Sequence, residues 1–146
     1  MKRQITALVF QAKAFDTIEE MNKRENIPLK VETIQDDLDI YREIIGCDYV
    51  EITGRCIGNG NYVIICDESG RYADNVVFTI VSDNGHYLDV PGTVIITGPV
   101  DTKGELTSLS QKDIGNIVSC VSVTVQEVGG VDKYVPAIIQ SGQPIF

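Results

Sequence analysis

Histidine is nearly absent from this chain, and the cysteines lack the spacing of a metal site. Among 146 residues there is one histidine, His86, and the four cysteines include no Cys-x-x-Cys pair. Structural zinc sites take four cysteine or histidine ligands at such short spacings, so we expect no metal site. His86 follows Asn84-Gly85, a dipeptide typical of turns, which favours an exposed turn residue. A catalytic pair of His86 with Cys47 or Cys66 stays open as an alternative.

Basic residues and long apolar runs are also scarce. There are 12 basic residues against 21 acidic ones, which gives a net charge of −9. Binding to nucleic-acid phosphates needs clustered lysine and arginine, so we expect no direct nucleic-acid binding. No run approaches the roughly 20 apolar residues of a membrane span, and the apolar segment 5–10 is too short for a signal peptide. We therefore expect a cytoplasmic protein whose acidic surface either confers solubility or imitates nucleic acid toward a cationic partner.

Two groups of residues resemble sites but are better explained by local structure. Asp36, Asp37 and Asp39 lack the spacing of a calcium loop and are typical of a helix N-terminus. The glycines at positions 54, 58 and 60 are not followed by Gly-Lys-Ser/Thr, so they form no phosphate loop. The four cysteines are expected to be reduced thiols that behave as small apolar residues. We therefore predict no catalytic residue, no cofactor and no metal.

The sequence does contain short alternating segments separated by turn signals, above all between residues 46 and 98. Such a pattern predicts an α+β fold: a small, mainly antiparallel twisted sheet with two or three short helices and a C-terminal β-hairpin extension. At this length we expect one domain. Its parts are a strand-helix-strand unit at 1–35, a core at 36–118, and a hairpin extension and tail at 119–146. Helices are predicted at 14–25, 36–46 and 110–118, and strands at 5–10, 29–34, 49–53, 75–81, 93–97, 121–126 and 134–139.

The turn Asn59-Gly60 predicts the register of a central hairpin, because Asn-Gly favours a two-residue type I′ turn. Folding the chain about it pairs Cys56 with Val63. Alternation then gives two apolar faces, so we expect this part of the sheet to be covered on both sides. One face carries Val50, Ile52, Cys56, Val63 and Ile65, and the other carries Ile57, Tyr62, Ile64 and Cys66.

The C-terminal segment predicts a second hairpin that turns at Gly129-Gly130. Its first strand alternates, with valines at 121, 123 and 125 on the apolar side. Pro136 places the second strand, 134–139, at a sheet edge, because proline has no N–H to donate to a neighbouring strand. We expect that edge to pair with a second copy in a homodimer or to be covered by the tail.

Candidate binding residues follow from this arrangement. On an open sheet face, an aromatic ring can stack on a nucleobase while an arginine holds a phosphate. The candidates for a small ligand are Tyr49, Arg55, Tyr62, Arg71 and His86. Apolar anchors for a protein partner, beside the acidic charge, are predicted at Tyr134, Ile145 and Phe146.

The central part of the chain resembles the uncharacterised family numbered 3846 among domains of unknown function. The resemblance rests on the helix 38–46, the strand 49–53, the turn 67–70, Asn75, the segment 89–98 and the loop 104–110. Residues 14–25 and everything after 121 depart from the pattern. Members of that family are similar short proteins of phages, plasmids and bacterial genomes. The resemblance implies a mobile-element context and no established activity.

Three functions remain as hypotheses. The first is a noncatalytic binding protein of phage or mobile-element type that sequesters a nucleotide-like ligand or modulates host defence. The second is an acidic, protein-binding inhibitor of a host nuclease or effector. The third is an uncharacterised enzyme.

Overall fold

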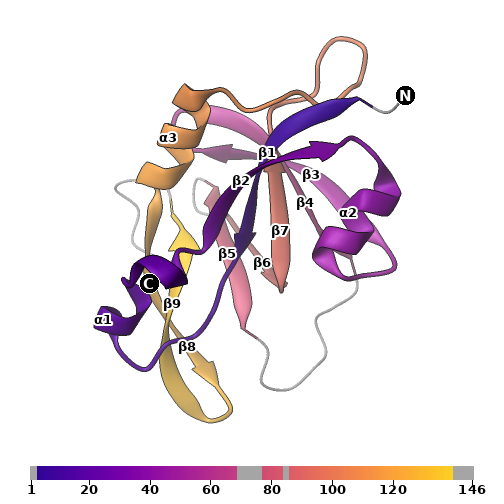
Figure 1. Cartoon of the computed structure of the whole chain (residues 1–146). Helices are drawn as coiled ribbons and strands as arrows, with labels where there is room; N and C mark the ends of the chain where they lie inside the picture. The colour runs from indigo at the N-terminus through magenta and orange to yellow at the C-terminus, as the bar shows by residue number, and fades with distance from the viewer. Residues whose placement is uncertain (1–2, 69–76, 84–85, 140–146) are drawn as a thin grey trace.

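The computed structural model describes residues 3–68, 77–83 and 86–139, which form two β-sheets and three short α-helices (Figure 1). The elements are β1 (Gln4–Gln11), α1 (Ile18–Met21), a 3-10 turn (Arg24–Asn26), β2 (Leu29–Gln35), α2 (Leu38–Ile45), β3 (Val50–Ile57), β4 (Gly60–Asp67), β5 (Phe78–Asp83), β6 (His86–Pro91), β7 (Thr93–Thr97), α3 (Gln111–Ser119), β8 (Val121–Val128) and β9 (Val131–Ile138). Sheet A has the strand order β2-β1-β7-β4-β3, and sheet B has the order β6-β5-β9-β8.

Antiparallel pairing dominates both sheets. The exception is the contact of β5 with β9, which are parallel where Val81 meets Ile138. The predicted α+β class, with mainly antiparallel strands, short helices and a C-terminal hairpin, is confirmed. Among the described residues, none of the helices has the length and apolar character needed to cross a membrane.

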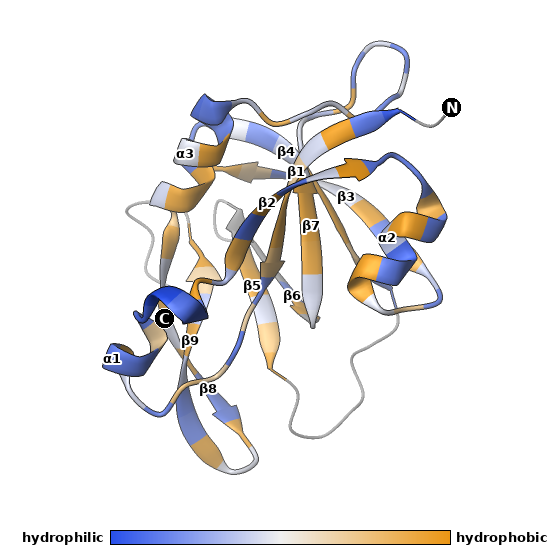
Figure 2. Ribbon diagram, in the orientation of Figure 1, coloured by the Kyte–Doolittle hydropathy of each residue, from blue (hydrophilic) through white to orange (hydrophobic). Residues whose placement is uncertain are grey.

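Sheet A is the middle layer, because both of its faces are covered. Sheet B and α3 pack on one face, where the first core contains Phe10, Ile96 and Ile117. On the other face α2 packs over the second core, which contains Tyr41 and Ile95. β7 lies in the middle of sheet A and is hydrophobic along most of its length (Figure 2). This two-sided burial explains why the three central strands of sheet A, β1, β7 and β4, have nearly continuous apolar sequences.

The β3–β4 hairpin confirms the predicted faces but corrects the predicted turn. Cys56 lies opposite Asn61, not Val63, and the turn is therefore Gly58-Asn59. Gly58 has a φ of +57°, and Asn116 of α3 holds the turn by donating to the carbonyl of Ile57 at 2.8 Å. The pairing is displaced by two residues on β4, and a displacement of two leaves every side chain on the same face.

The first predicted helix, at 14–25, is wrong in extent. α1 covers only Ile18–Met21, and the 3-10 turn follows it. Phe15 lies outside the helix because its backbone pairs with Tyr134 of β9, with both N–H to O distances at 2.9 Å. Thr17 caps the helix by accepting the N–H of Glu20 at 3.1 Å. The first turn of the predicted helix is therefore not formed, because its backbone pairs with β9 instead.

The other two helices begin and end where the sequence indicates. Asp37 caps α2 by accepting the N–H of Asp39 at 2.9 Å, and Gly46 ends the helix with a φ of +80°. In α3 the predicted capping box is present. Asp113 donates its N–H to the Ser110 hydroxyl at 3.1 Å, and its carboxylate accepts the Ser110 N–H at 3.0 Å.

The capping box gives a pH-dependent prediction. The N–H and then the hydroxyl of Ser110 lower the pKa of Asp113, so its contribution is present above the unfolded pKa of about 4 and is lost as the pH falls through the lower folded value. We expect Asp113→Asn to lower the urea midpoint at neutral pH, and to lower it less in acid. Ser110→Ala should cost about 1 kcal/mol at neutral pH. Equal effects of Asp113→Asn at both pH values would contradict this account.

The β8–β9 hairpin turns at Gly129-Gly130 as predicted, but its inward face is polar. Thr124 is buried, and its hydroxyl donates to the carbonyl of Val135 at 2.8 Å. Gln126 accepts the N–H of Phe78 at 2.9 Å and donates to the Phe78 carbonyl at 2.7 Å. The valines at 123 and 125, predicted to face the core, are exposed. The inward polar groups are accommodated because each is hydrogen-bonded.

The prediction that segment 134–139 forms a sheet edge is also wrong. β9 pairs with β8 along its whole length, and its other side meets β5 at Ile138 and Phe15 at Tyr134. Within the part of the chain that the structure describes, the outer edge of this hairpin is that of β8. Homodimer formation stays a prediction, and β8 is the edge available for it. The tail from residue 140 lies outside the described residues.

Candidate functional site

The structure buries one of the predicted ligand residues. Tyr62 is 3% exposed, so its ring is not available to stack on a base. Its hydroxyl donates to Asp113 at 3.1 Å and accepts from Asn116 at 3.0 Å. Burial raises the pKa of Tyr62, which keeps the hydroxyl protonated as a donor. Tyr62 therefore fixes α3 on the β3–β4 hairpin, and its predicted role in ligand stacking is wrong.

Tyr49 and Arg55, the remaining candidates whose side chains the structure describes, are not gathered into one site. Tyr49 is 64% exposed just before β3, and Arg55 lies six residues further along the chain, about 20 Å away in an extended strand. The Arg55 guanidinium donates to the Thr53 hydroxyl at 2.7 Å and to the Gly54 carbonyl at 2.8 Å. His86 begins β6 in sheet B. Arg71 lies outside the described residues.

Of the three predicted protein-binding anchors, the structure describes Tyr134. Tyr134 is half-buried, and its backbone pairs with Phe15. The neighbouring Lys133 forms an ion pair with Asp16, which ties the same stretch of β9 to the chain before α1. Ile145 and Phe146 lie outside the described residues. The role of Tyr134, Ile145 and Phe146 as anchors for a protein partner therefore stays a prediction.

A groove on the α2 side of β3 brings together the more promising residues, and we call it the β3 groove. It consists of two shallow depressions of about 440 and 430 Å³ that share Ile52. Strand alternation places Ile52, Gly54 and Cys56 on this side of β3. The first depression is also lined by Thr53, Arg55, Asn61, Tyr62, Val63, Pro99 and Val100, and so includes two of the predicted ligand residues. The second is lined by Asp36, Asp37, Leu38, Tyr41, Gly104, Glu105 and Leu106.

The centre of the β3 groove is apolar and open. Ile52 and Leu38 are each 48% exposed, and Val100 is 50% exposed. Leu38 lies in the first turn of α2, at the groove. Gly54 leaves a gap between its larger neighbours, because a Cβ built on it would meet nothing closer than the Tyr62 carbonyl at 3.9 Å. Exposed apolar side chains gathered in this way are typical of interaction surfaces.

The rim of the β3 groove is acidic and held in place by a small network. The Tyr41 hydroxyl donates to Asp36 at 2.5 Å, and Arg3 forms ion pairs with Asp36 at 3.2 Å and Glu105 at 3.6 Å. Arg3 also donates to the carbonyl of Leu106. Burial, and then the hydrogen bond to Asp36, raise the pKa of Tyr41 far above its usual range, so it remains a donor. Three carboxylates line the groove, at Asp36, Asp37 and Glu105, and two guanidinium groups belong to it, Arg3 at the rim and Arg55 in the first depression, so the groove keeps a net charge of −1.

The metal-ligating and nucleophilic side chains that the structure describes are spread over the fold. Within the described ranges, no three histidine, cysteine or acidic side chains lie close enough to hold a metal ion. Cys66 and Cys120 are buried, and none of the four cysteines is in a disulfide. Burial, and then the charge of Asp67, raise the pKa of the Cys47 thiol, which disfavours the reactive thiolate. The side chain of His86 lies outside the described part of the chain.

Comparison with known proteins identifies the family. A model of the domain of unknown function DUF3846 matches residues 21–121, about two thirds of the chain. The chain belongs to the DUF3846 family. No curated protein and no solved structure matches it. The DUF3846 match covers both strands of the groove hairpin, α2 and the loop at 98–106, so the groove lies within the family region. β1, β8 after Val121 and β9 lie outside that region.

Sequence reasoning found the acidic residues of this groove but assigned them only to helix capping. Asp37 does cap α2, as predicted. The missing information was the position of the loop 98–106, whose Val100 and Glu105 complete the groove. The sequence did contain one signal for the groove. Leu38, at the first helical position, is an apolar residue within an acidic run.

Proposed function

We propose that this DUF3846 protein is a noncatalytic binding protein whose β3 groove holds a basic, apolar segment of a partner protein. The carrying observation is the half-exposed set of Leu38, Ile52 and Val100 beside the carboxylates of Asp36 and Glu105. An apolar centre with a charged rim is the usual anatomy of a protein interface. The apolar contacts supply affinity, and the rim selects a positive partner and speeds the encounter.

The position of the groove favours an extended segment. Among the described strands, β3 is the last of sheet A and has β4 as its one neighbour there. An extended peptide can add to the free backbone edge of such a strand, while alternate side chains enter the neighbouring groove. Leucine or valine side chains would lie over Ile52 and Gly54, and lysine or arginine would reach the rim.

The partner class that fits this chemistry is a protein with a basic surface, such as a nuclease. Nucleic-acid-binding proteins carry clustered lysine and arginine, and an acidic groove on a chain of net charge −9 competes for that surface. This favours the hypothesis of an acidic inhibitor of a host nuclease or effector. Modulation of host defence by a phage or mobile-element protein is the biological setting proposed for it.

The test uses a labelled peptide that alternates lysine with leucine, and a matched peptide that alternates glutamate with leucine. Fluorescence anisotropy should show binding of the basic peptide only, with affinity that falls as salt rises. Gly54→Val fills the groove in a position with room for a side chain, and it should weaken binding at least tenfold. Gly115→Ala, on the exposed face of α3, is the matched control and should bind like the wild type. Equal binding of both peptides, or by both variants, would refute the proposal.

A further inference from the structure

A second depression of about 330 Å³ lies at the other end of α2 and has a different charge. Leu38, at the start of α2, borders the β3 groove, whereas Ile44, near its end, borders this depression. Its walls come from β1, β2, the start of β7 and the segment that joins α1 to β2. The backbone N–H of Gln11 donates to the carbonyl of Pro28 at 3.0 Å and so connects two of these walls. The volume is at the lower end of the range for small-molecule sites.

Two lysines give this depression its positive charge. Lys13 and Lys30 line it, both are exposed, and neither takes part in an ion pair found among the described residues. Glu32 is the acidic residue of the lining, so the lining carries a net charge of +1 on a chain of −9. The register of β1 with β2 sets Lys30 opposite Val9 and Glu32 opposite Ala7. Lys30 and Glu32 therefore lie on the α2 side of β2.

Apolar and amide groups complete the lining. Val9 and Ile44 pack against the second core, while Ile27 is 58% exposed at the opposite wall. Asn26 donates its amide N–H to the carbonyl of Glu20 at 2.7 Å, which fixes the side chain and leaves its oxygen as an acceptor. The depression thus offers cations for an anion, flat apolar surface for a ring, and acceptors for N–H groups.

We propose that this depression binds a purine nucleoside monophosphate. The phosphate would lie at the ammonium groups of Lys13 and Lys30, and the base would pack against Ile27 and Ile44. A carboxylate has two acceptor oxygens, and guanine presents two adjacent N–H donors, so Glu32 favours guanine over adenine. This site is separate from the β3 groove and does not depend on the function proposed for it. It assigns the nucleotide-like ligand to residues other than Tyr49, Arg55 or Tyr62.

Isothermal titration calorimetry on the full chain tests this site, with GMP, AMP and inorganic phosphate as probes. GMP should bind more tightly than AMP, and both more tightly than inorganic phosphate. Lys30→Ala should weaken GMP binding about tenfold or more, since it removes a charge-assisted hydrogen bond. Glu32→Gln should reduce the preference for GMP over AMP.

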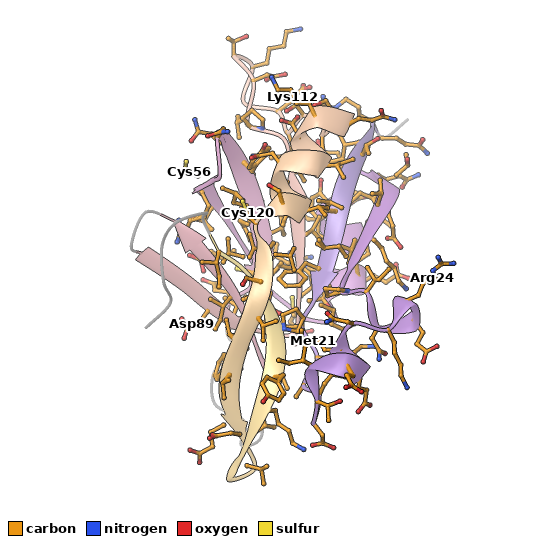
Figure 3. All side chains as sticks on the ribbon, turned by 90° about the vertical axis from the view of Figure 1, so that its left-hand side faces the viewer. Met21, Arg24, Cys56, Asp89, Lys112 and Cys120 are labelled. Carbon is orange, nitrogen blue, oxygen red and sulfur yellow. The ribbon has the colours of Figure 1, made fainter. Side chains whose placement is uncertain are left out.

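Lys112→Ala is the matched control, because it removes one exposed lysine of α3, at the end of the molecule away from Arg24 and Met21 (Figure 3). It should bind GMP like the wild type. Gly54→Val should also leave GMP binding unchanged, which separates this site from the β3 groove. Absence of GMP binding, or equal weakening by Lys30→Ala and Lys112→Ala, would overturn the proposal. Binding of inorganic phosphate as tight as that of GMP would overturn the nucleoside assignment.

Discussion

A fragment limited to residues 21–121, the region of the DUF3846 match, is expected not to fold. The fragment lacks β1, which pairs with both β2 and β7 inside sheet A, and it lacks β9 of sheet B. Four β1 residues, Ile5, Ala7, Leu8 and Phe10, are at most 2% exposed. Burial of each large apolar side chain contributes about 1.5–3 kcal/mol, and the total stability of a domain is only about 5–15 kcal/mol. The loss of Ile5, Leu8 and Phe10 alone is therefore comparable to the whole stability of a domain, and the loss of β9 adds to it.

Circular dichroism and amide NMR spectra measure this directly. The fragment 21–121 should give collapsed amide dispersion and no cooperative melting transition. The fragment 3–139 keeps every described strand and should melt cooperatively, which makes it the control for truncation as such. A cooperative transition in the shorter fragment would show that sheet A forms without β1. It would contradict the conclusion that the buried side chains of β1 are required for folding.

Gly98→Ala should destabilise the protein by about 1–3 kcal/mol, the usual cost of forcing extra atoms into a packed region. A Cβ at Gly98 would lie 2.9 Å from the carbonyl oxygens of both Thr107 and Ser108. These carbonyls cannot simply rotate away, because they belong to a backbone that is anchored to sheet A. The Gly98 N–H donates to the Thr107 carbonyl at 2.9 Å, and the Leu109 N–H donates to Thr6 at 2.9 Å.

Urea unfolding of Gly98→Ala should show a lower midpoint than the wild type. Gly115→Ala is the matched control, since a Cβ there has no atom within 4 Å and the residue lies inside α3. Alanine is the better helix former, so this variant should gain up to about 1 kcal/mol. If both variants unfold at the wild-type midpoint, the close approach at Gly98 is not a constraint.

Periodicity predicted the faces of strands better than it predicted their partners. In β3 and β4 the turn signal at Asn59-Gly60 gave a register displaced by two residues, yet the two apolar faces were assigned correctly. The same alternation failed in β8, where Thr124 faces inward and Val125 outward. Alternation distinguishes the two faces of a strand, but only neighbouring elements decide which one is covered. Here Thr124 and Gln126 face inward because each has a hydrogen-bond partner.

Neither candidate site was predicted as a unit, because each is assembled from segments far apart in the chain. In the β3 groove, Ile52 and Val100 meet through the loop that follows β7. In the second depression, Lys13 and Lys30 line the same wall region because β1 and β2, which α1 separates in the sequence, pair as antiparallel neighbours. Local patterns identify the residue types and the secondary structure, but not these juxtapositions. The hydrogen bonds of Tyr62 to Asp113 and Asn116 in α3 also join distant parts of the chain. The sequence does not reveal them, and Tyr62 was therefore predicted to contact a ligand.

The strand order also sets when the protein can acquire its structure during synthesis. β1 leaves the ribosome first, but one of its two neighbours is β7, and Leu8 pairs with Ile96. In sheet B, β5 meets its partner β9 at Ile138, close to the end of the described residues. Pairings between such distant segments fold slowly, because the intervening chain must be ordered before they form. β2 can pair with one edge of β1 soon after synthesis, but the other edge lacks its partner until β7 emerges, and the nascent chain is most vulnerable to aggregation before that point.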